Sequence, residues 1–192
     1  MNAGSIPSTV FLLAVVVTAA VSAQKSPTVP MRAGDIFPRL EGDFLSGRKA
    51  VLPDAAQGKL ALVLMGFSYG SRTAVEAWAE HVRPAFTAHE AATFFEVPVL
   101  GGMARMGKWF IDSGMRKGTP KELHENVITV WGNVDRWKAL AGFSKRAEDD
   151  AYLTLIGRDG RILWLHHGPY SAEAFDAMMA AASPAPTGEK NP

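Results

Sequence analysis

The stretch LALVLMGFSYGSR, residues 60–72, decides the fold. Leu60 to Phe67 form an unbroken apolar run, which is typical of a central strand covered on both faces. Polar residues from Ser68 to Arg72 end the strand. A helical pattern follows, with apolar residues on one face: Val75, Trp78, Val82 and Phe86. The sequence therefore predicts a buried strand that leads directly into an amphipathic helix.

Local signals predict how this helix begins and ends. Thr73 and Glu76 have the spacing of a capping box, in which the hydroxyl accepts a backbone N–H and the carboxylate reaches back. A hydroxyl cap from Ser71 is the alternative. Pro84 lies inside the pattern and predicts a kink or an end, because proline lacks the backbone N–H.

The remaining elements follow in a regular order. Residues 33–53 suit an N-terminal β-hairpin with its turn near Ser46-Gly47. Pro98 is expected to mark an edge or an end of its strand. Further strands are predicted at residues 93–100, 128–131, 152–156 and 161–165, with the turn Arg158-Asp159-Gly160 between the last two. Helices are predicted at residues 103–115, before a Gly/Pro break at 118–120, and at residues 135–140.

The last predicted helix has a clear start. Ser171 is a good N-cap, and Tyr170 and Phe175 are placed to form a hydrophobic staple across it. Its core face is expected to consist of Phe175, Met178, Met179 and Ala182. The complete order predicts an α/β fold of three layers, α/β/α, with a central mixed sheet and an N-terminal β-hairpin over residues 31–182.

Length, charge and composition limit the classes of function that the chain can have. The chain has 192 residues, enough for one domain with a sizeable core, and a net charge of +1. No basic run alternates with aromatic residues, so we expect no nucleic-acid partner. The chain contains no cysteine.

The N-terminus predicts export. Residues 9–21 are almost wholly apolar, and Val21-Ser22-Ala23 is a small-residue site that predicts cleavage between Ala23 and Gln24. Residues 1–23 are thus interpreted as a signal peptide and residues 24–30 as a linker. The predicted location is periplasmic or extracellular, and the alternative is a membrane anchor formed by an uncleaved leader. Residues 183–192 read as a disordered, Pro-rich tail.

Several short sequence motifs resemble those of a known family. The order of elements, with GDIFP at residues 34–38 and LTLIGRDGRILW at residues 153–164, resembles the peroxiredoxin-like branch of the thioredoxin superfamily. Within that branch the chain is most similar to the mitochondrial ATP synthase assembly-factor family known as ATPase complex subunit ten. The resemblance covers about residues 31–182 and rests on these residues: Gly34-Asp35, Phe37-Pro38, Leu60 to Ser68, Trp78, Gly114-Met115-Arg116, Pro120, Glu122-Leu123-His124, Thr129 to Gly132, Asp149 to Leu153 and Asp159 to Trp164.

This resemblance locates a reactive position and shows that its chemistry is missing. Thioredoxin-like oxidoreductases place a thiolate at the start of the first core helix, where the helix dipole lowers the pKa of the thiol. The matching residues here, Ser68 to Arg72, offer hydroxyls and no thiol. The cis-proline that such enzymes carry before the penultimate strand is also absent from Asp149 to Tyr152. We therefore expect no disulfide exchange, no peroxidase activity and no cofactor.

Other polar groups are candidates for catalysis or metal binding. A serine nucleophile at Ser68 or Ser71 would need a base within hydrogen-bond reach, and the segment is not a nucleophile elbow. His166 and His167 are neighbours in a strand and should point to opposite faces, which disfavours a shared metal. Asp149-Asp150 can do acid–base work but is more typical of a solvated loop. We expect no metal site.

One stretch predicts a binding surface. Met103, Met106, Trp109, Phe110 and Met115 alternate with basic side chains, namely Arg105, Lys108, Arg116 and Lys117. Such a helix can lie on a membrane or hold an apolar protein segment. The simpler interpretation is that its apolar side packs on the sheet, although three adjacent bulky residues from Trp109 to Ile111 cannot share one face.

The main functional hypothesis is a redox-inactive binding or assembly protein for a protein client, such as a membrane-protein segment. The resemblance implies assembly of the membrane sector of ATP synthase. The residues expected to contact the partner are Met106, Trp109, Phe110, Arg116, Ser68, Ser71 and Arg72. Two alternatives stay open. One is an enzyme that uses His166, His167 or the Asp149-Asp150 pair, and the other is an accessory subunit that docks on a redox partner.

Overall fold

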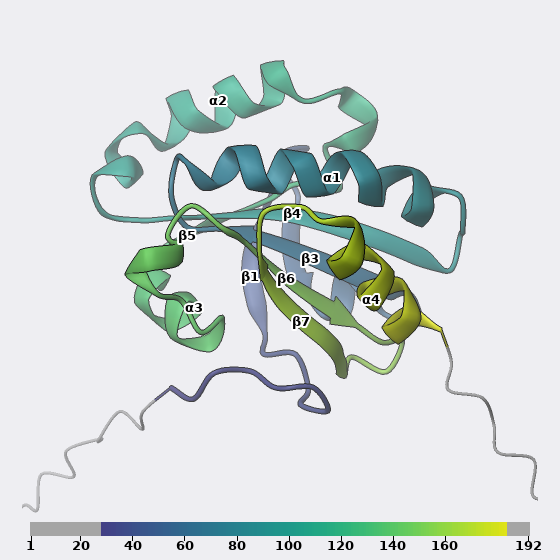
Figure 1. The fold of residues 1–192 in the computed structure, drawn as a ribbon. Coiled ribbons are helices and arrows are strands. Elements are labelled where there is room, and N and C mark those ends of the chain that lie inside the picture. Colours follow the sequence, from purple (N-terminus) through teal and green to yellow (C-terminus); the bar gives the residue numbers. More distant parts are fainter. Residues whose placement is uncertain (1–27, 184–192) are drawn as a thin grey trace, which may run out of the picture.

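The computed structural model describes residues 28–183, which form a seven-stranded mixed sheet with helices on both faces (Figure 1). The predicted signal peptide, the cleavage site at Ala23-Gln24, most of the linker and the tail after Ser183 lie outside the described residues. None of the helices between residues 28 and 183 is long and apolar enough to cross a membrane.

The sheet has the strand order β2-β1-β5-β4-β3-β6-β7. Its strands are β1 (Leu40–Phe44), β2 (Lys49–Leu52), β3 (Leu60–Gly66), β4 (Ala92–Leu100), β5 (Ile128–Trp131), β6 (Ala151–Ile156) and β7 (Ile162–Gly168). β3, β4 and β5 run parallel, whereas β1, β2, β6 and β7 are antiparallel to their neighbours. The predicted hairpin is β1–β2, and Gly47 in its turn has a φ of 95°, which favours glycine. The hairpin and the mixed sheet are both confirmed.

β3 lies near the middle of the sheet and is buried on both faces, as its unbroken apolar run predicted. Ala61, Val63 and Met65 pack into one hydrophobic cluster. Leu62 and Leu64 pack into the cluster on the opposite face. Successive side chains of a strand point to opposite faces, so a strand between two cores must be apolar at every position.

The helices are α1 (Ser71–Thr87), α2 (Lys108–Gly118), α3 (Val134–Leu140) and α4 (Ala172–Ala182). α1 and α4 cover one face, with Trp78 and Met178 buried beneath them. α3 covers the other face through Trp137. α2 lies on the same side as α1 and is the outermost helix there (Figure 1). The three-layer α/β/α arrangement is therefore confirmed. The other short elements are 3-10 turns: η1 (Asp54–Ala56), η2 (Gly102–Gly107), η3 (Lys121–Leu123) and η4 (Lys145–Ala147).

α4 begins as predicted. The Oγ atom of Ser171 accepts a hydrogen bond from the backbone N–H of Ala174 at 3.1 Å, and the rings of Tyr170 and Phe175 contact across the cap. The predicted core face of α4 was partly wrong, because Met179 is exposed and Ala174 is buried instead. Successive side chains of an α-helix are rotated by about 100°, so Met179 points away from the core that buries Met178.

Pro84 and Pro98 do not end their elements. α1 continues through Pro84 to Thr87, and the side of the helix that carries Pro84 is exposed, so the lost hydrogen bond lies near the solvated end. β4 continues through Pro98 to Leu100 between β3 and β5. Proline removes one donor only, and the pairing of Val99 and Leu100 with β5 resumes at once.

The starts of two helices also differ from the prediction. α1 begins at Ser71, before Thr73, so the Thr73–Glu76 capping box does not form and Glu76 pairs with Arg72 at 2.6 Å. The helix predicted over residues 103–115 begins as the 3-10 turn η2 and becomes α-helical only at Lys108. Gly102 at the start of η2 has a φ of 58°. The predicted Gly/Pro break does end α2, at Gly118.

Candidate functional site

Three loops meet at one edge of the sheet. β3 and β4 are parallel neighbours, with Gly66 paired to Pro98, so the chain leaves both strands at the same edge. β6 is antiparallel to β3, with Tyr152 paired to Met65, so the residues before β6 reach this edge too. Ligands of open α/β sheets bind beyond the carboxyl ends of the parallel strands. The candidate site therefore lies at this edge.

The junction loop, residues 68–72 between β3 and the first turn of α1, is tied together by its two serines. The Ser68 Oγ accepts a hydrogen bond from the Ser71 backbone N–H at 2.9 Å. The Oγ of the buried Ser71 donates to the Ser68 carbonyl at 2.8 Å and accepts from the Ser68 N–H at 3.3 Å. The N-cap residue of α1 is Gly70, and the first backbone N–H of the helix, that of Ser71, is satisfied by Ser68, which corrects the predicted cap at Ser71 or Thr73.

A carboxylate lies against the start of α1. Ser68 Oγ donates to Asp149 Oδ1 at 2.6 Å, a contact between residues 81 positions apart. A Cβ added to Gly70 would lie only 2.4 Å from the same oxygen, so glycine is what leaves room for the carboxylate. The N-terminus of a helix favours a negative charge. Asp149 therefore supplies an anion where thioredoxin-like enzymes place a thiolate.

The tip of the junction loop points into solvent. Tyr69 is 88% exposed, although its neighbours are held by the serine contacts. The Arg72 guanidinium is exposed and paired with Glu76 on the next turn. An aromatic ring carried on a fixed loop is suited to contact with another molecule.

The histidines and the second aspartate form separate contacts. His167 Nδ1 lies 2.8 Å from Asp150 Oδ2, and the ring of His167 stacks on Tyr152. The ring of His166 lies against Trp78 and Trp164 on the other face of the sheet. Burial lowers the pKa of His166, and the nearby His167 acts in the same direction. The predicted opposite orientation of the two histidines is confirmed.

This arrangement is not a Ser-His-Asp triad. Ser68 contacts the carboxylate of Asp149 directly, with no imidazole between the two. The imidazole of His167 is paired with a different carboxylate. Within residues 28–183, no three side chains of the metal-ligating types are grouped.

A second part of the site is an apolar patch on η2 and α2, formed by Met106, Trp109 and Phe110. These side chains are 88%, 80% and 76% exposed. The simpler expectation, that the apolar side of this helix packs on the sheet, is wrong for these three residues. Ile111 is half-buried, and Asp112 is the buried residue of α2.

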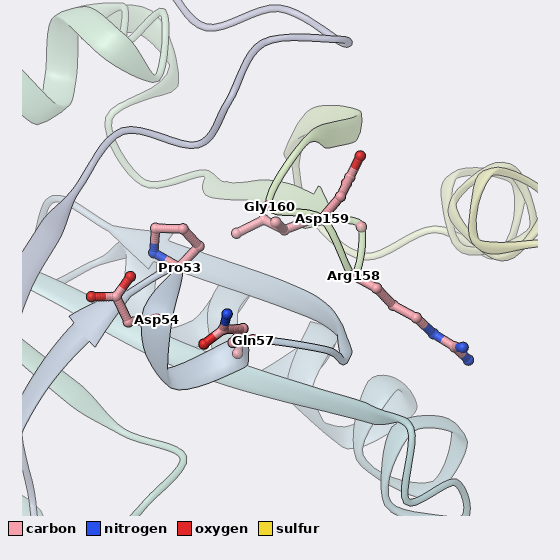
Figure 2. Close-up of a pocket in the computed structure, with 9 residues that line it drawn as sticks. Pro53, Asp54, Gln57, Arg158, Asp159 and Gly160 are labelled. Atoms are coloured by element: carbon pink, nitrogen blue, oxygen red, sulfur yellow. The ribbon is translucent and has the colours of Figure 1, made fainter.

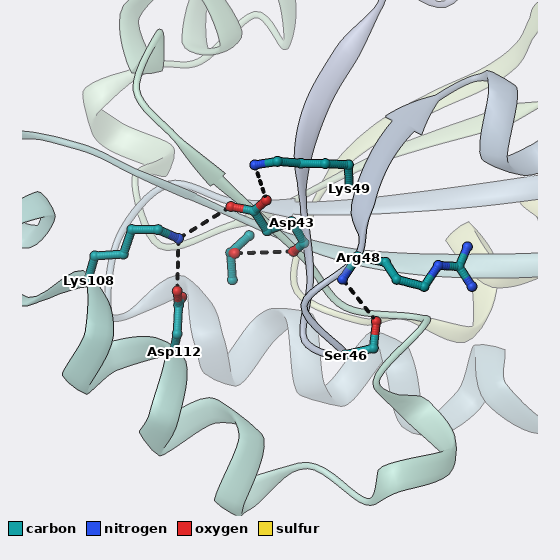
Figure 3. Close-up of polar contacts among 7 residues, drawn as sticks. Asp43, Ser46, Arg48, Lys49, Lys108 and Asp112 are labelled. Carbon is teal, nitrogen blue, oxygen red and sulfur yellow. Dashed lines mark hydrogen bonds and ion pairs between the residues drawn. The ribbon is translucent and has the colours of Figure 1, made fainter.

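Polar contacts hold α2 on the sheet (Figure 3). Lys108 Nζ lies 2.8 Å from Asp112 Oδ2 and 3.4 Å from Asp43 Oδ2 on β1, and it sits 4.8 Å from the centre of the Trp131 ring. At the other end, Arg116 Nε donates to the Leu45 carbonyl at 2.6 Å. An ordinary surface helix turns its apolar side toward the sheet. In α2, Lys108 and Asp112 face inward and the apolar patch faces solvent.

Asp43 is central to this attachment because it also accepts a hydrogen bond from Lys49 at 2.6 Å (Figure 3). Partial burial alone would raise the pKa of Asp43. The hydrogen bonds from Lys49 and Lys108 outweigh that effect and hold the pKa below its ordinary value. Sequence reasoning missed this contact. The only local signal was the spacing of Lys108 and Asp112, which suits an ion pair on one helix face.

Two hollows of the surface lie away from both parts of the site. One, of about 190 Å³, lies between the end of β2 and the β6–β7 turn, with Pro53, Asp54 and Gln57 facing Arg158 to Gly160 (Figure 2). Another, of about 310 Å³, is lined by residues that include Arg39, Trp131 and Arg136. Neither includes the junction loop or the apolar patch.

No protein-family model matches this chain, and no curated protein matches it. Solved structures do. A protein from Chlorobium tepidum described as a thiol:disulfide interchange protein, DsbE, is 20% identical with a TM-score of 0.54, over 79% of this chain and 98% of that one. A peroxiredoxin-like protein from Aquifex aeolicus is 11% identical with a TM-score of 0.51, over 79% and 88%. The chain has a thioredoxin-like fold.

StoA from Bacillus subtilis has the same thioredoxin-like architecture, with 10% identity and a TM-score of 0.50 over 80% of this chain and 99% of that protein. At these identities the likeness concerns the fold alone. The matched proteins include thiol:disulfide interchange proteins, whereas this chain has no cysteine. None of the likenesses supports the narrower resemblance to the ATP synthase assembly-factor family.

The fit between Gly70 and Asp149 yields the first prediction. In Gly70→Ala the new Cβ displaces the carboxylate and breaks the Ser68–Asp149 hydrogen bond, so we expect the free energy of unfolding to fall by about 1 kcal/mol. Asp149→Ala should cost a similar amount. Because both changes remove one contact, the double variant should lose no more than either single variant in urea unfolding. Additive losses would show that Gly70 and Asp149 act independently.

The attachment of α2 yields a pH prediction. A carboxyl whose pKa is lowered by folding stabilises the protein above its unfolded value, near 3.8, and this stability is lost as the pH falls through the folded pKa. We therefore expect Asp43→Asn to cost about 1 kcal/mol at neutral pH and almost nothing well below pH 3.8. Urea unfolding across this range measures the difference. Asp159→Asn, which alters an exposed pair with Arg161, is the control and should change little at any pH. An Asp43→Asn loss that persists in acid would contradict the account.

Proposed function

We propose that this chain is a redox-inactive thioredoxin-like binding protein that holds a segment of a protein client during the assembly of a membrane complex. The observation that carries the proposal is the junction loop. It keeps a helix-start position built from Ser68 and Ser71 without sulfur, and it presents Tyr69 to solvent. The position is thus arranged for contact.

The proposal starts from the missing sulfur. Disulfide exchange and thiol peroxidase chemistry both proceed through a thiolate, and the chain contains no cysteine. The hydroxyls of Ser68 and Ser71 are occupied by hydrogen bonds within the loop and with Asp149. The fold of thiol enzymes is therefore present here without a group that can carry their reaction.

The loop is well suited to bind. Ser68, Ser71 and Asp149 fix its backbone before any partner arrives, which reduces the entropy lost on binding. Tyrosine is among the residues that contribute most to protein interfaces, because its ring is apolar and its hydroxyl can still form a hydrogen bond. Arg72 on the first turn of α1 lies near Tyr69 in the chain and is exposed and paired with Glu76.

The proposed client rests on the sequence resemblance alone. The resemblance to the ATP synthase assembly-factor family supports a membrane complex as the client, with ATP synthase as the specific candidate. Export, which rests on residues 9–21 and the site at Ala23-Gln24, would place the chain on the opposite side of the membrane from that family. The proposal therefore specifies a segment exposed on the outer side of the membrane.

Site-directed photocrosslinking tests the proposal. A photoreactive residue at position 69 should capture a discrete membrane-complex subunit in the cells that make the chain. The same residue at Arg158, which is exposed on the β6–β7 turn at the opposite edge of the sheet, is the matched control and should capture nothing.

Three outcomes decide the matter. Capture of a membrane-complex subunit from position 69 supports the proposal if an excess of unlabelled Tyr69→Ser protein does not reduce it. Capture of a thiol oxidoreductase from position 69 would instead identify an accessory subunit of a redox partner. Equal labelling from both positions, or none, would contradict a client site at the junction loop.

A further inference from the structure

The apolar patch has a geometry that the fold does not require. Met106, Trp109 and Phe110 have the spacing i, i+3, i+4, which places them on one side of the helical segment formed by η2 and α2. All three side chains project into solvent. None of the residues of α2 belongs to either hydrophobic cluster of the core.

The patch cannot be turned inward without breaking the attachment of α2. Lys108 is bound to Asp43 and Asp112 and lies over the Trp131 ring, while Arg116 is bound to the Leu45 carbonyl. These contacts use the opposite side of the helix. Rotation of the apolar residues toward the sheet would separate Lys108 from Asp43 and Trp131, and Arg116 from the Leu45 carbonyl, so these contacts favour the outward orientation of the patch.

Two exposed lysines follow the patch in the chain. Lys117 in the last turn of α2 and Lys121 in η3 are exposed, and neither pairs with a carboxylate among the residues that the structure describes. Asp112 is buried and neutralised by Lys108, which leaves Glu122 as the exposed acid of the segment from Gly102 to Leu123. The surface is therefore basic although the whole chain carries a net charge of only +1.

We propose that η2 and α2 form a peripheral docking element for the surface of an anionic lipid bilayer. Trp109, Phe110 and Met106 enter the boundary between headgroups and acyl chains, where tryptophan is favoured, and Lys117 and Lys121 face the anionic headgroups. A bound peptide helix would need a groove to receive it. Here the apolar side chains project outward, and the two hollows described above lie elsewhere.

The docking element goes beyond the proposed function and does not depend on it. α2 is the outermost helix on its side of the sheet, so it can meet a flat surface before the other helices do (Figure 1). η2 leaves the same edge of the sheet as the junction loop. Docking through this element would hold the junction loop close to the bilayer.

The absence of cysteine allows a site-specific test. In the full chain, Met106→Cys provides a single thiol for an environment-sensitive fluorophore, and Ile36→Cys, exposed near the opposite edge, provides the matched control. Vesicles of phosphatidylcholine with phosphatidylglycerol should shift the emission of the label at position 106 to the blue. The label at position 36 should not respond, and pure phosphatidylcholine vesicles should act weakly on both. The apolar segment at residues 9–21 is present in both proteins.

Variants then separate the two contributions. Trp109→Ser with Phe110→Ser, in the Met106→Cys chain, should weaken vesicle binding about tenfold or more. Lys117→Gln with Lys121→Gln should weaken vesicle binding about fivefold for each charge removed. Added salt should also weaken vesicle binding, because it screens the attraction between the lysines and the headgroups. All these side chains are exposed, so circular dichroism and thermal unfolding should be unchanged.

The proposal is overturned if position 106 shows no shift, if positions 106 and 36 shift equally, or if the Trp109 and Phe110 changes leave binding intact. A shift at position 106 produced by the chain alone at higher concentration would mean that a second copy covers the patch. A shift that needs a membrane protein in the vesicles would mean that the patch binds protein and not lipid. Either of these results also overturns it.

Discussion

The hydrogen bond between Ser68 and Asp149 determines the structure of the position at which thiol enzymes of this fold carry their thiolate. It joins the start of α1 to the loop before β6, across 81 positions of the chain, and it places a carboxylate at the positive end of a 17-residue helix. In thiol enzymes the same electrostatic feature stabilises a thiolate. Here a carboxylate takes that place and accepts a hydrogen bond from Ser68. The position therefore becomes a fixed surface, and Tyr69 at its tip is free to contact a partner.

A second polar contact has a comparable effect on α2. Helices on a sheet usually bury apolar side chains, and the free energy of that burial sets their orientation. α2 is oriented by Lys108, Asp43 and Arg116 instead, which leaves Met106, Trp109 and Phe110 outside. Both parts of the site thus follow one principle. Specific polar contacts hold a segment in place so that its apolar or aromatic side chains stay in solvent.

Local pattern was sufficient to predict the fold and to select the segments of the candidate site, but not the contacts that hold those segments. The apolar run at Leu60 to Phe67, the hairpin turns and the Ser171 cap depend on neighbours in sequence, and all three were predicted correctly. Pro84 and Pro98 broke local rules because the surrounding helix and sheet tolerate one missing donor. The contacts Ser68–Asp149 and Lys108–Asp43 join residues 81 and 65 positions apart. No spacing rule links such distant residues, so only the topology could show that they meet.

Hydrogen–deuterium exchange of the full chain, with and without membranes from the cells that make it, tests the central claim most directly. The claim is that one edge of the sheet serves for contact. The account predicts slower exchange confined to residues 68–72 and 102–118, and unchanged exchange in the β6–β7 turn at the opposite edge. Protection centred on that turn, or none at either segment, would contradict it.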